Sequence, residues 1–186
     1  HSPACRPRPF QLTPRSLTLR SVEFEAMLTG GHPNSLGRTE EVVALVLEDP
    51  GRLGELFDTY GAEDPTVRLR VSSAFKRVGQ RRPELLVPEI DRLLIQPGET
   101  DQPSARWTFA LLMAMLESDL SPGQRSRALG LMKRDLETSD DWIVQNTTMQ
   151  VLADWSEEDP ELRDWLMPHL ERFTESHRKS VANRAR

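Results

Sequence analysis

The feature that most constrains this chain is an amphipathic helical pattern that returns about every 38 residues. A stripe of apolar residues at helical spacing begins at Val67, and equivalent stripes begin at Ala105, Val144 and Val181. The steps between these positions are 38, 39 and 37 residues. A unit repeated at this period cannot bury its apolar face alone, so neighbouring units must stack. The sequence therefore predicts an all-α protein built from stacked repeats.

In three of the repeats a second helix follows, and it starts at a proline. Pro83, Pro122 and Pro160 recur at steps of 39 and 38 residues, in register with the apolar stripes. Proline is favoured in the first turn of a helix, because the N–H that it lacks would have no helical partner there. Ser121 and Asp159 are expected to cap two of these helices by accepting hydrogen bonds from exposed N–H groups. Each repeat is therefore predicted to be a hairpin of two helices.

Two more prolines fall inside predicted second helices. Pro88 and Pro168 cannot donate the N–H that an interior helical hydrogen bond needs, and their rings crowd the preceding turn. Both are expected to bend or locally break their helices. No segment shows the period-two alternation that indicates a β-strand.

The repeats also define how the chain is divided. Residues 1–22 form a basic segment rich in proline and arginine, which is expected to lie outside the fold. Residues 23–186 are predicted to form a single repeat domain. Its expected parts are a cap helix over 21–28, repeats over roughly 39–60, 64–95, 101–137 and 140–175, and a truncated last helix over 177–186.

The best-formed repeat carries the motifs of a known family. Residues 64–68 read Asp-Pro-Thr-Val-Arg at the start of an apolar helix, and residues 83–86 read Pro-Glu-Leu-Leu at the start of the next. This pattern resembles a HEAT repeat, and the resemblance covers roughly residues 40–186. It implies a right-handed α-α superhelix, a solenoid of hairpins, whose second helices line the inner, ligand-facing side. Later copies depart from the motif at Gln102, Asp141 and Gln145. A resemblance of this kind describes architecture and says little about function.

Hydrophobicity and cysteine usage exclude two kinds of protein. The longest apolar run, residues 109–116, is eight residues long. A helix that spans a bilayer needs about 20, so no membrane segment is expected. The single cysteine, Cys5, cannot form an intrachain disulfide, and the core must hold the fold by itself. This cysteine usage is typical of a reducing compartment, and we expect a cytoplasmic location.

The charge distribution bears on the kind of partner. Residues 1–22 hold four arginines and no acid, so the rest of the chain is more acidic than the net charge of −5 indicates. An acidic body repels a phosphate backbone unless one face is locally basic. Basic side chains do crowd two predicted helices, around Arg77 and Arg134, but few aromatic residues lie beside them to stack on bases. A protein or peptide partner is therefore favoured over nucleic acid, and the chain is expected to be a monomer or a weak oligomer.

One irregular segment, residues 29–39, has a composition of its own. It is rich in glycine, and its polar candidates are His32, Asn34 and Arg38. Such a loop could present N–H groups and an arginine to an anion. Two glutamates open the following helix and would oppose a phosphate. The alternative is a turn that joins the cap helix to the stack.

The helix predicted over 140–155 is the richest in unusual polar and aromatic residues. In repeat register, two ladders of equivalent positions run along the stack. They are Leu69, Trp107, Asn146 and Asn183, and beside them Arg68, Arg106 and Gln145. Such ladders commonly satisfy backbone groups and fix the stacking. The functional alternative is a recognition groove in which tryptophan flanks hydrogen-bonding amides. Its candidate residues are Trp107, Trp142, Gln145 and Asn146, with Arg134 added from the basic helix.

No catalytic, metal or cofactor site is expected. The four histidines include no pair at the i, i+4 spacing of a helical metal site. The chain has no Gly-x-Ser-x-Gly sequence, and its one cysteine lies in the basic segment, so no nucleophile for acyl transfer is evident. We therefore expect a non-enzymatic scaffold that binds a protein or peptide on the concave face of the stack.

Two alternatives rest on fold resemblance. HEAT-like alkylpurine DNA glycosylases carry tryptophan, aspartate and arginine on a basic concave face, and Trp142, Asp141 and Trp155 could supply such groups here. This alternative implies a DNA-binding enzyme, and the acidic body weighs against it. The other alternative is a bilin-lyase-like HEAT protein or a chaperone for a cofactor protein, for which no cofactor signature is present.

Overall fold

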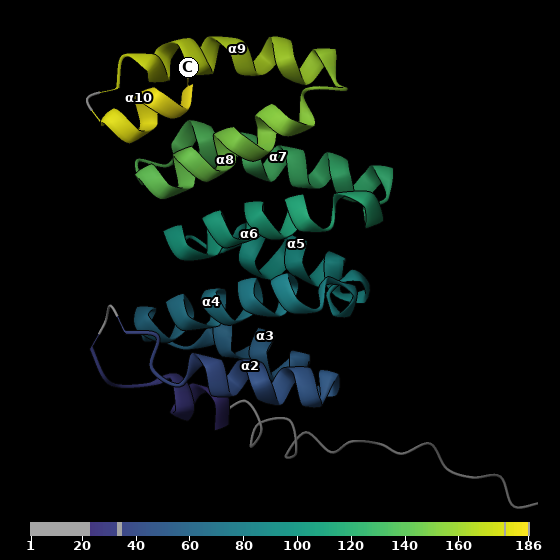
Figure 1. Cartoon of the computed structure of the whole chain (residues 1–186), viewed down its shortest axis with the longest axis vertical. Coiled ribbons are helices and arrows are strands. Elements are labelled where there is room, and N and C mark those ends of the chain that lie inside the picture. Colours follow the sequence, from purple (N-terminus) through teal and green to yellow (C-terminus); the bar gives the residue numbers. More distant parts are fainter. Residues whose placement is uncertain (1–22, 33–34, 177, 186) are drawn as a thin grey trace, which may run out of the picture.

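The computed structural model of the chain describes residues 23–32, 35–176 and 178–185, and the expectations for residues 1–22 and for Asn34 lie outside this range. All regular elements in the described ranges are helical, and none of them is a strand. The helices lie across the long axis of the molecule, and their layers follow the chain along it, except that α10 turns back to lie between α8 and α9 (Figure 1).

The chain begins its described part with a helix at residues 23–28 and continues with nine longer or similar α-helices. Their bounds are α2 Thr39–Glu48, α3 Leu53–Asp58, α4 Pro65–Arg81, α5 Ile90–Glu99, α6 Pro103–Met115, α7 Pro122–Thr138, α8 Trp142–Trp155, α9 Pro160–Thr174 and α10 Lys179–Ala185. Short 3-10 turns occupy Pro50–Arg52, Thr59–Gly61, Pro83–Leu85, Val87–Glu89 and Glu117–Asp119.

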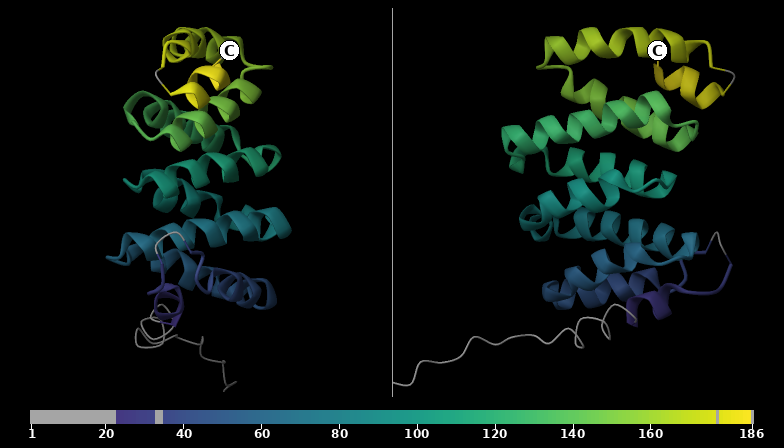
Figure 2. Two further views of the ribbon diagram at one scale, coloured as in Figure 1. Left: turned by 60° about the vertical axis from the view of Figure 1, so that its left-hand side comes forward. Right: turned by 180° about the vertical axis from the view of Figure 1, so that it is seen from behind.

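The helices form two rows. We call α2, α4, α6, α8 and α10 the first row, in which each helix contacts the next. The second row contains α3, α5, α7 and α9. Of these, α5 packs on α6 and α7 packs on α8, so a second helix supports the first helix of the following hairpin. The first row lies in front in Figure 1, and the second row lies in front in the rear view of Figure 2.

Side-chain caps explain why several helices begin where they do. The Asp64 carboxylate accepts a hydrogen bond from the Thr66 N–H at 2.8 Å, and α4 starts with Pro65. Ser121 and Gln124 form a reciprocal capping box at the start of α7. Asp159 accepts from the Leu162 N–H at 3.0 Å. The caps predicted at Ser121 and Asp159 are therefore confirmed.

The two prolines that were predicted to interrupt second helices, Pro88 and Pro168, behave differently. Pro88 falls in a 3-10 turn, Val87–Glu89, and α5 begins only at Ile90, so the predicted break is confirmed. Pro168 lies inside α9, which continues from Pro160 to Thr174 without interruption. The missing N–H of Pro168 removes one interior hydrogen bond, yet α9 continues on both sides of this proline.

A single apolar cluster runs through the whole stack. It contains the inward stripes that the sequence predicts, because each helix buries one face against the next layer. Their fully buried members include Val67, Val71, Phe75, Phe109, Leu112, Leu152 and Val181. Burying one such side chain contributes about 1.5–3 kcal/mol, so this continuous cluster stabilises the stack. In the described part of the chain, no helix is both long and apolar enough to cross a bilayer.

Candidate functional site

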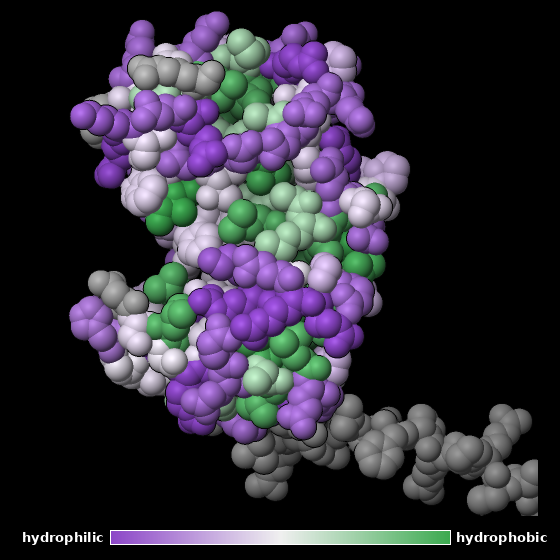
Figure 3. Space-filling model, viewed as in Figure 1, coloured by the Kyte–Doolittle hydropathy of each residue, from purple (hydrophilic) through white to green (hydrophobic). Residues whose placement is uncertain are grey.

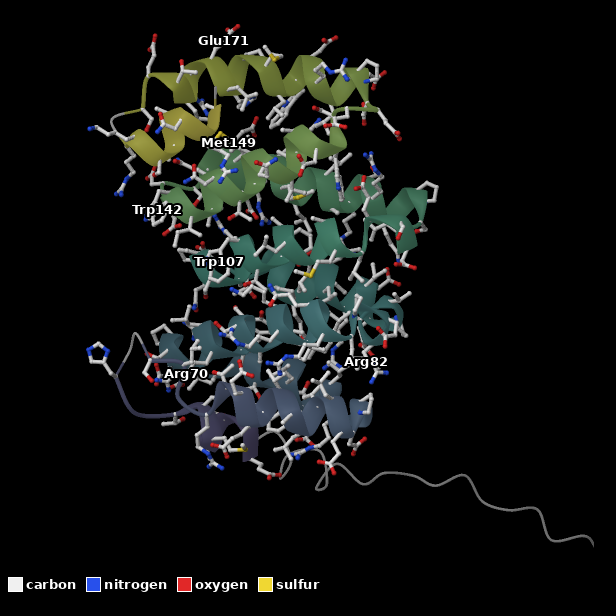
Figure 4. The ribbon with its side chains drawn as sticks, viewed as in Figure 1. Arg70, Arg82, Trp107, Trp142, Met149 and Glu171 are labelled. Atoms are coloured by element: carbon white, nitrogen blue, oxygen red, sulfur yellow. The ribbon has the colours of Figure 1, made fainter. Side chains whose placement is uncertain are left out.

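The glycine-rich loop is organised around a buried arginine, Arg70. This side chain comes from α4 and is 1% exposed. Its Nη1 donates to the carbonyl oxygens of Leu28 at 2.5 Å and Gly30 at 2.6 Å. Its Nε and Nη2 donate to the carbonyl oxygens of Ser35 at 3.0 Å and His32 at 3.1 Å. Figure 4 labels Arg70 beside the loop. The loop therefore turns its carbonyl oxygens inward onto a guanidinium.

The contact with Arg70 also explains one glycine of the loop, Gly37. Gly37 has a φ of +52°, and an added Cβ would lie 3.1 Å from the Cζ of Arg70. Arg38, the proposed anion ligand, pairs with Glu41 at 2.7 Å. His32 is exposed. Arg70, which is not among the candidate residues predicted from the sequence, therefore explains Gly37 and the inward direction of four loop carbonyl oxygens.

The ladder of Arg68, Arg106 and Gln145 fixes the loops between hairpins. Arg68 Nη1 donates to the carbonyl oxygen of Glu63 at 2.9 Å, and Gln145 Nε2 donates to that of Ser139 at 2.8 Å. Arg106 Nη2 donates to the Asp101 carboxylate at 2.8 Å. Each side chain thus reaches back into the loop before its own helix. These contacts give the ladder a structural role.

Arg134 lies away from the other candidates, on α7 in the second row. Its Nη2 donates to the Gly98 carbonyl oxygen and to the buried Asp135 carboxylate, both at 2.7 Å. Burial raises the pKa of Asp135, while Arg134 and then Arg106 act in the opposite direction. Arg134 thus joins α7 to the end of α5, and it does not reach the cavities that Trp107, Trp142 and Asn146 line.

The ladder of Leu69, Trp107, Asn146 and Asn183 faces outward and lines two cavities. Leu69 and Trp107 line one of about 390 Å³ at the N-terminal ends of α4, α6 and α8, where the surface in Figure 3 is indented at the left edge. Asn146 and Asn183 line another of about 540 Å³, together with Trp142. The Oδ1 atom of Asn146 is buried without a hydrogen-bond partner. Figure 4 shows Trp107 and Trp142 on the same edge of neighbouring layers.

Helix α6 has an apolar outer face as well as an apolar inner face. Arg106 is the only charged residue among its 13 positions. Trp107 and Leu111 are partly buried but lie outside the core cluster, and Ala114 is exposed. Figure 3 shows green and pale green atoms over α6, between purple bands over α4 and over α8 and α10. A helix that is apolar all round is normally covered, so this face marks a candidate interaction site.

Three cavities follow the seam between α6 and α8, which we call the α6–α8 groove. At the N-terminal end lies the 390 Å³ cavity, lined by Trp107 and Ile143. In the middle lies one of about 180 Å³, lined by Leu111, Asn146, Thr147 and Val151. At the C-terminal end lies one of about 520 Å³, lined by Ala114, Met115 and Trp155. The 13 residues of α6 rise about 1.5 Å each, so the groove is about 20 Å long.

The C-terminal end of this groove is acidic. Its lining includes Glu117, Asp154, Glu157 and Glu158. The C-terminal, negative ends of the α6 and α8 dipoles also lie at this end of the groove and add to its negative potential. Two cations lie near this end. Arg125 of α7 lies 3.7 Å from Glu117 and 3.5 Å from Asp159, and its guanidinium sits 4.8 Å from the centre of the Trp155 ring. Arg163 of α9 donates to the Glu157 carbonyl oxygen at 2.7 Å. The end of the groove therefore retains an excess of negative charge.

Leu111, Ala114 and the acidic end are not among the site residues predicted from the sequence, although a signal for them is present. The apolar run at residues 109–116 is too short to span a membrane, but it is long enough to leave a helix without a polar face. Such a helix exposes apolar surface wherever its neighbours do not cover it.

Within the described ranges, no three His, Cys, Asp or Glu side chains form a group that could hold a metal ion. Comparison with known proteins adds no further candidate, since no family model and no curated protein matches this chain.

Proposed function

We propose that this chain is a non-enzymatic binding module of the HEAT-like, right-handed solenoid type, and that it binds a partner protein or peptide in the α6–α8 groove. The observation that carries the proposal is the apolar outer face of α6. Trp107, Leu111 and Ala114 lie beside three cavities and outside the core. Removing apolar surface of this kind from water is favourable, so its burial by a partner would stabilise the complex.

The proposed surface differs from the one that the HEAT resemblance implies. That resemblance puts the ligand on the second helices, whereas α6 and α8 both belong to the first row. The second row also lacks an equivalent seam among the cavities described above, although Ile95 on α5 is 50% exposed. We therefore place the partner on the first row.

Ion pairing weighs against the DNA-binding alternative. Arg77 and Arg81, which belong to the basic cluster of α4, both pair with Glu40, at 2.5 and 2.8 Å. Arg127 of α7 pairs with Glu99 at 2.7 Å. A phosphate backbone would have to displace these carboxylates, and the counterion gain would be correspondingly smaller.

A pull-down tests the proposal. The full chain and its Leu111→Glu variant are used as bait in a lysate of the native cell, at low and high salt. We expect a protein that the wild-type chain retains at high salt and that the variant does not retain. Salt screens interactions between charges but does not weaken apolar contacts. Ile95→Glu is the matched control, because it adds the same charge at an exposed apolar residue of the second row. Retention that is identical for both variants, or of nucleic acid alone, contradicts the proposal.

A further inference from the structure

We propose that the occupant of the α6–α8 groove is an amphipathic helix that carries basic residues at one end. This inference rests on the proposed function and specifies the partner of the same site.

The spacing of the apolar residues along the groove is that of a helix. On the α6 side, Trp107, Leu111 and Ala114 follow one another at steps of four and three. On the α8 side, Ile143 and Thr147 are partly exposed at a step of four, whereas Val151, one further step along, is buried in the core. The α6 wall therefore offers about one side chain per helical turn over a length of about 20 Å, and the α8 wall offers two such side chains at its N-terminal half. A helix of about 13 residues presents its own apolar stripe at the same intervals, so ridges and grooves of the three helices can interdigitate.

Backbone chemistry favours a helix over an extended peptide. An extended chain needs N–H and C=O partners along its length, as at the edge of a sheet. The walls of the groove are α6 and α8, whose interior backbone groups are already paired within their own helices. The unpartnered Oδ1 of Asn146 is a single acceptor and satisfies at most one or two N–H groups. A helical occupant brings its own hydrogen bonds and leaves only side chains to be matched.

Charge fixes what one end of the occupant must carry. Glu117, Asp154, Glu157 and Glu158 line the C-terminal end of the groove, and the carboxylates there outnumber the nearby cations, Arg125 and Arg163. At the other end, the Asp141 carboxylate accepts hydrogen bonds from the N–H groups of Ile143 and Val144, at 2.9 and 3.1 Å, at the positive end of the α8 dipole. The negative potential is therefore concentrated at one end, where lysine or arginine side chains of the occupant would lie.

Selection from a random peptide library tests this inference directly. Random 16-residue peptides are displayed and selected against the full chain at moderate salt. We expect the enriched peptides to have apolar residues at i, i+3, i+4 and i+7 and a cluster of Lys or Arg at one end. Synthetic versions should gain helical circular dichroism on binding. Leu111→Glu should weaken binding at least tenfold, whereas Ile95→Glu should leave it unchanged.

The acidic end is tested by charge reversal. Glu157→Lys with Glu158→Lys should weaken the basic peptides several-fold and flatten the salt dependence of their binding. Glu171→Lys is the control, because Glu171 is exposed on α9 at the far end of the stack (Figure 4). Thermal unfolding of each variant confirms that it remains folded.

The outcomes separate the two proposals. Enriched peptides of period two that still lose binding in Leu111→Glu would overturn the helical occupant and uphold the binding groove. A library that yields no peptide sensitive to Leu111→Glu would overturn both. A wild-type dimer in sedimentation that Leu111→Glu converts to monomer would identify a second copy of the chain as occupant and overturn the basic helical partner.

Discussion

Helices α4 and α6 occupy equivalent places in successive hairpins, and they differ mainly in the C-terminal part of their outer faces. Both bury a stripe against the same core: Val71 and Phe75 in α4, Phe109 and Leu112 in α6. At the positions where α6 carries Trp107, Leu111 and Ala114, α4 carries Leu69, Ser73 and Lys76. Further along α4, Arg77 and Arg81 are held in ion pairs. The inner faces are similar because every layer must bury an apolar face against its neighbours. The difference between the outer faces is not needed for stacking, so we attribute it to the proposed binding of a partner in the α6–α8 groove.

The largest expected effect comes from comparing substitutions on the inner and outer faces of α6 by their free energies of unfolding. Leu112 is fully buried, and its Cδ2 lies 3.0 Å from the position that a Cβ on Gly79 of α4 would occupy. Leu112→Ala should lower the free energy of unfolding by about 2–5 kcal/mol, because it leaves a cavity between two layers.

Leu111→Ala is the matched control for that substitution. It removes the same atoms from the neighbouring residue, which is only partly buried and lies outside the core cluster. We expect a loss of less than about 1 kcal/mol. Both values come from urea unfolding, and equal losses would mean that the outer face of α6 is a structural part of the core.

The helical stripes were predictable because burial against a neighbour forces the same period in every layer. The first helices and the caps at Ser121 and Asp159 follow from local sequence alone. The groove was not predictable in the same way. Its walls come from two hairpins, and which side of α6 remains uncovered depends on how the layers are rotated against each other. The run at residues 109–116 indicated that one apolar face would be left over, but not that α8 would border it.

Arg70 shows a second limit of pattern analysis. It lies within the inward stripe of α4, between Val67 and Val71, where a charge contradicts the apolar pattern. That contradiction is a signal that a charged group is buried with partners. The partners are carbonyl oxygens of a loop some 40 residues away in sequence, and no sequence motif encodes such contacts.

Replacing this arginine should have the next largest effect. Arg70→Met keeps most of the side-chain volume but leaves the carbonyl oxygens of Leu28, Gly30, His32 and Ser35 without their donor. We expect the free energy of unfolding to fall by about 1–3 kcal/mol, because part of the exposed loop can rehydrate. Hydrogen exchange should rise first in the loop at residues 29–38. Unchanged exchange there would mean that Arg70 does not organise the loop.

A smaller effect is expected where α4 and the loop meet. Gly37→Ala places a side chain at a φ of +52° and within 3.1 Å of the Arg70 guanidinium. The left-handed conformation alone costs about 1–2 kcal/mol in a residue other than glycine. Gly61→Ala is the control, since nothing lies within 4 Å of its added Cβ and its φ is not left-handed. Urea unfolding should separate the two, and equal losses would argue against the contact with Arg70.

The smallest expected effect concerns pH and belongs to the second row. Burial raises the pKa of Asp135 above its ordinary 3.8 in the folded chain. The folded state therefore holds this proton more tightly than the unfolded state, and the contribution of Asp135 to stability falls as pH rises from 3.8 through the raised folded pKa. Asp135→Asn removes the titration while keeping an oxygen that accepts from Arg134. The difference in unfolding free energy between wild type and variant should shift in favour of the variant as pH rises over this interval. A difference that does not change with pH would show that Arg134 and Arg106 fully offset the burial of the carboxylate.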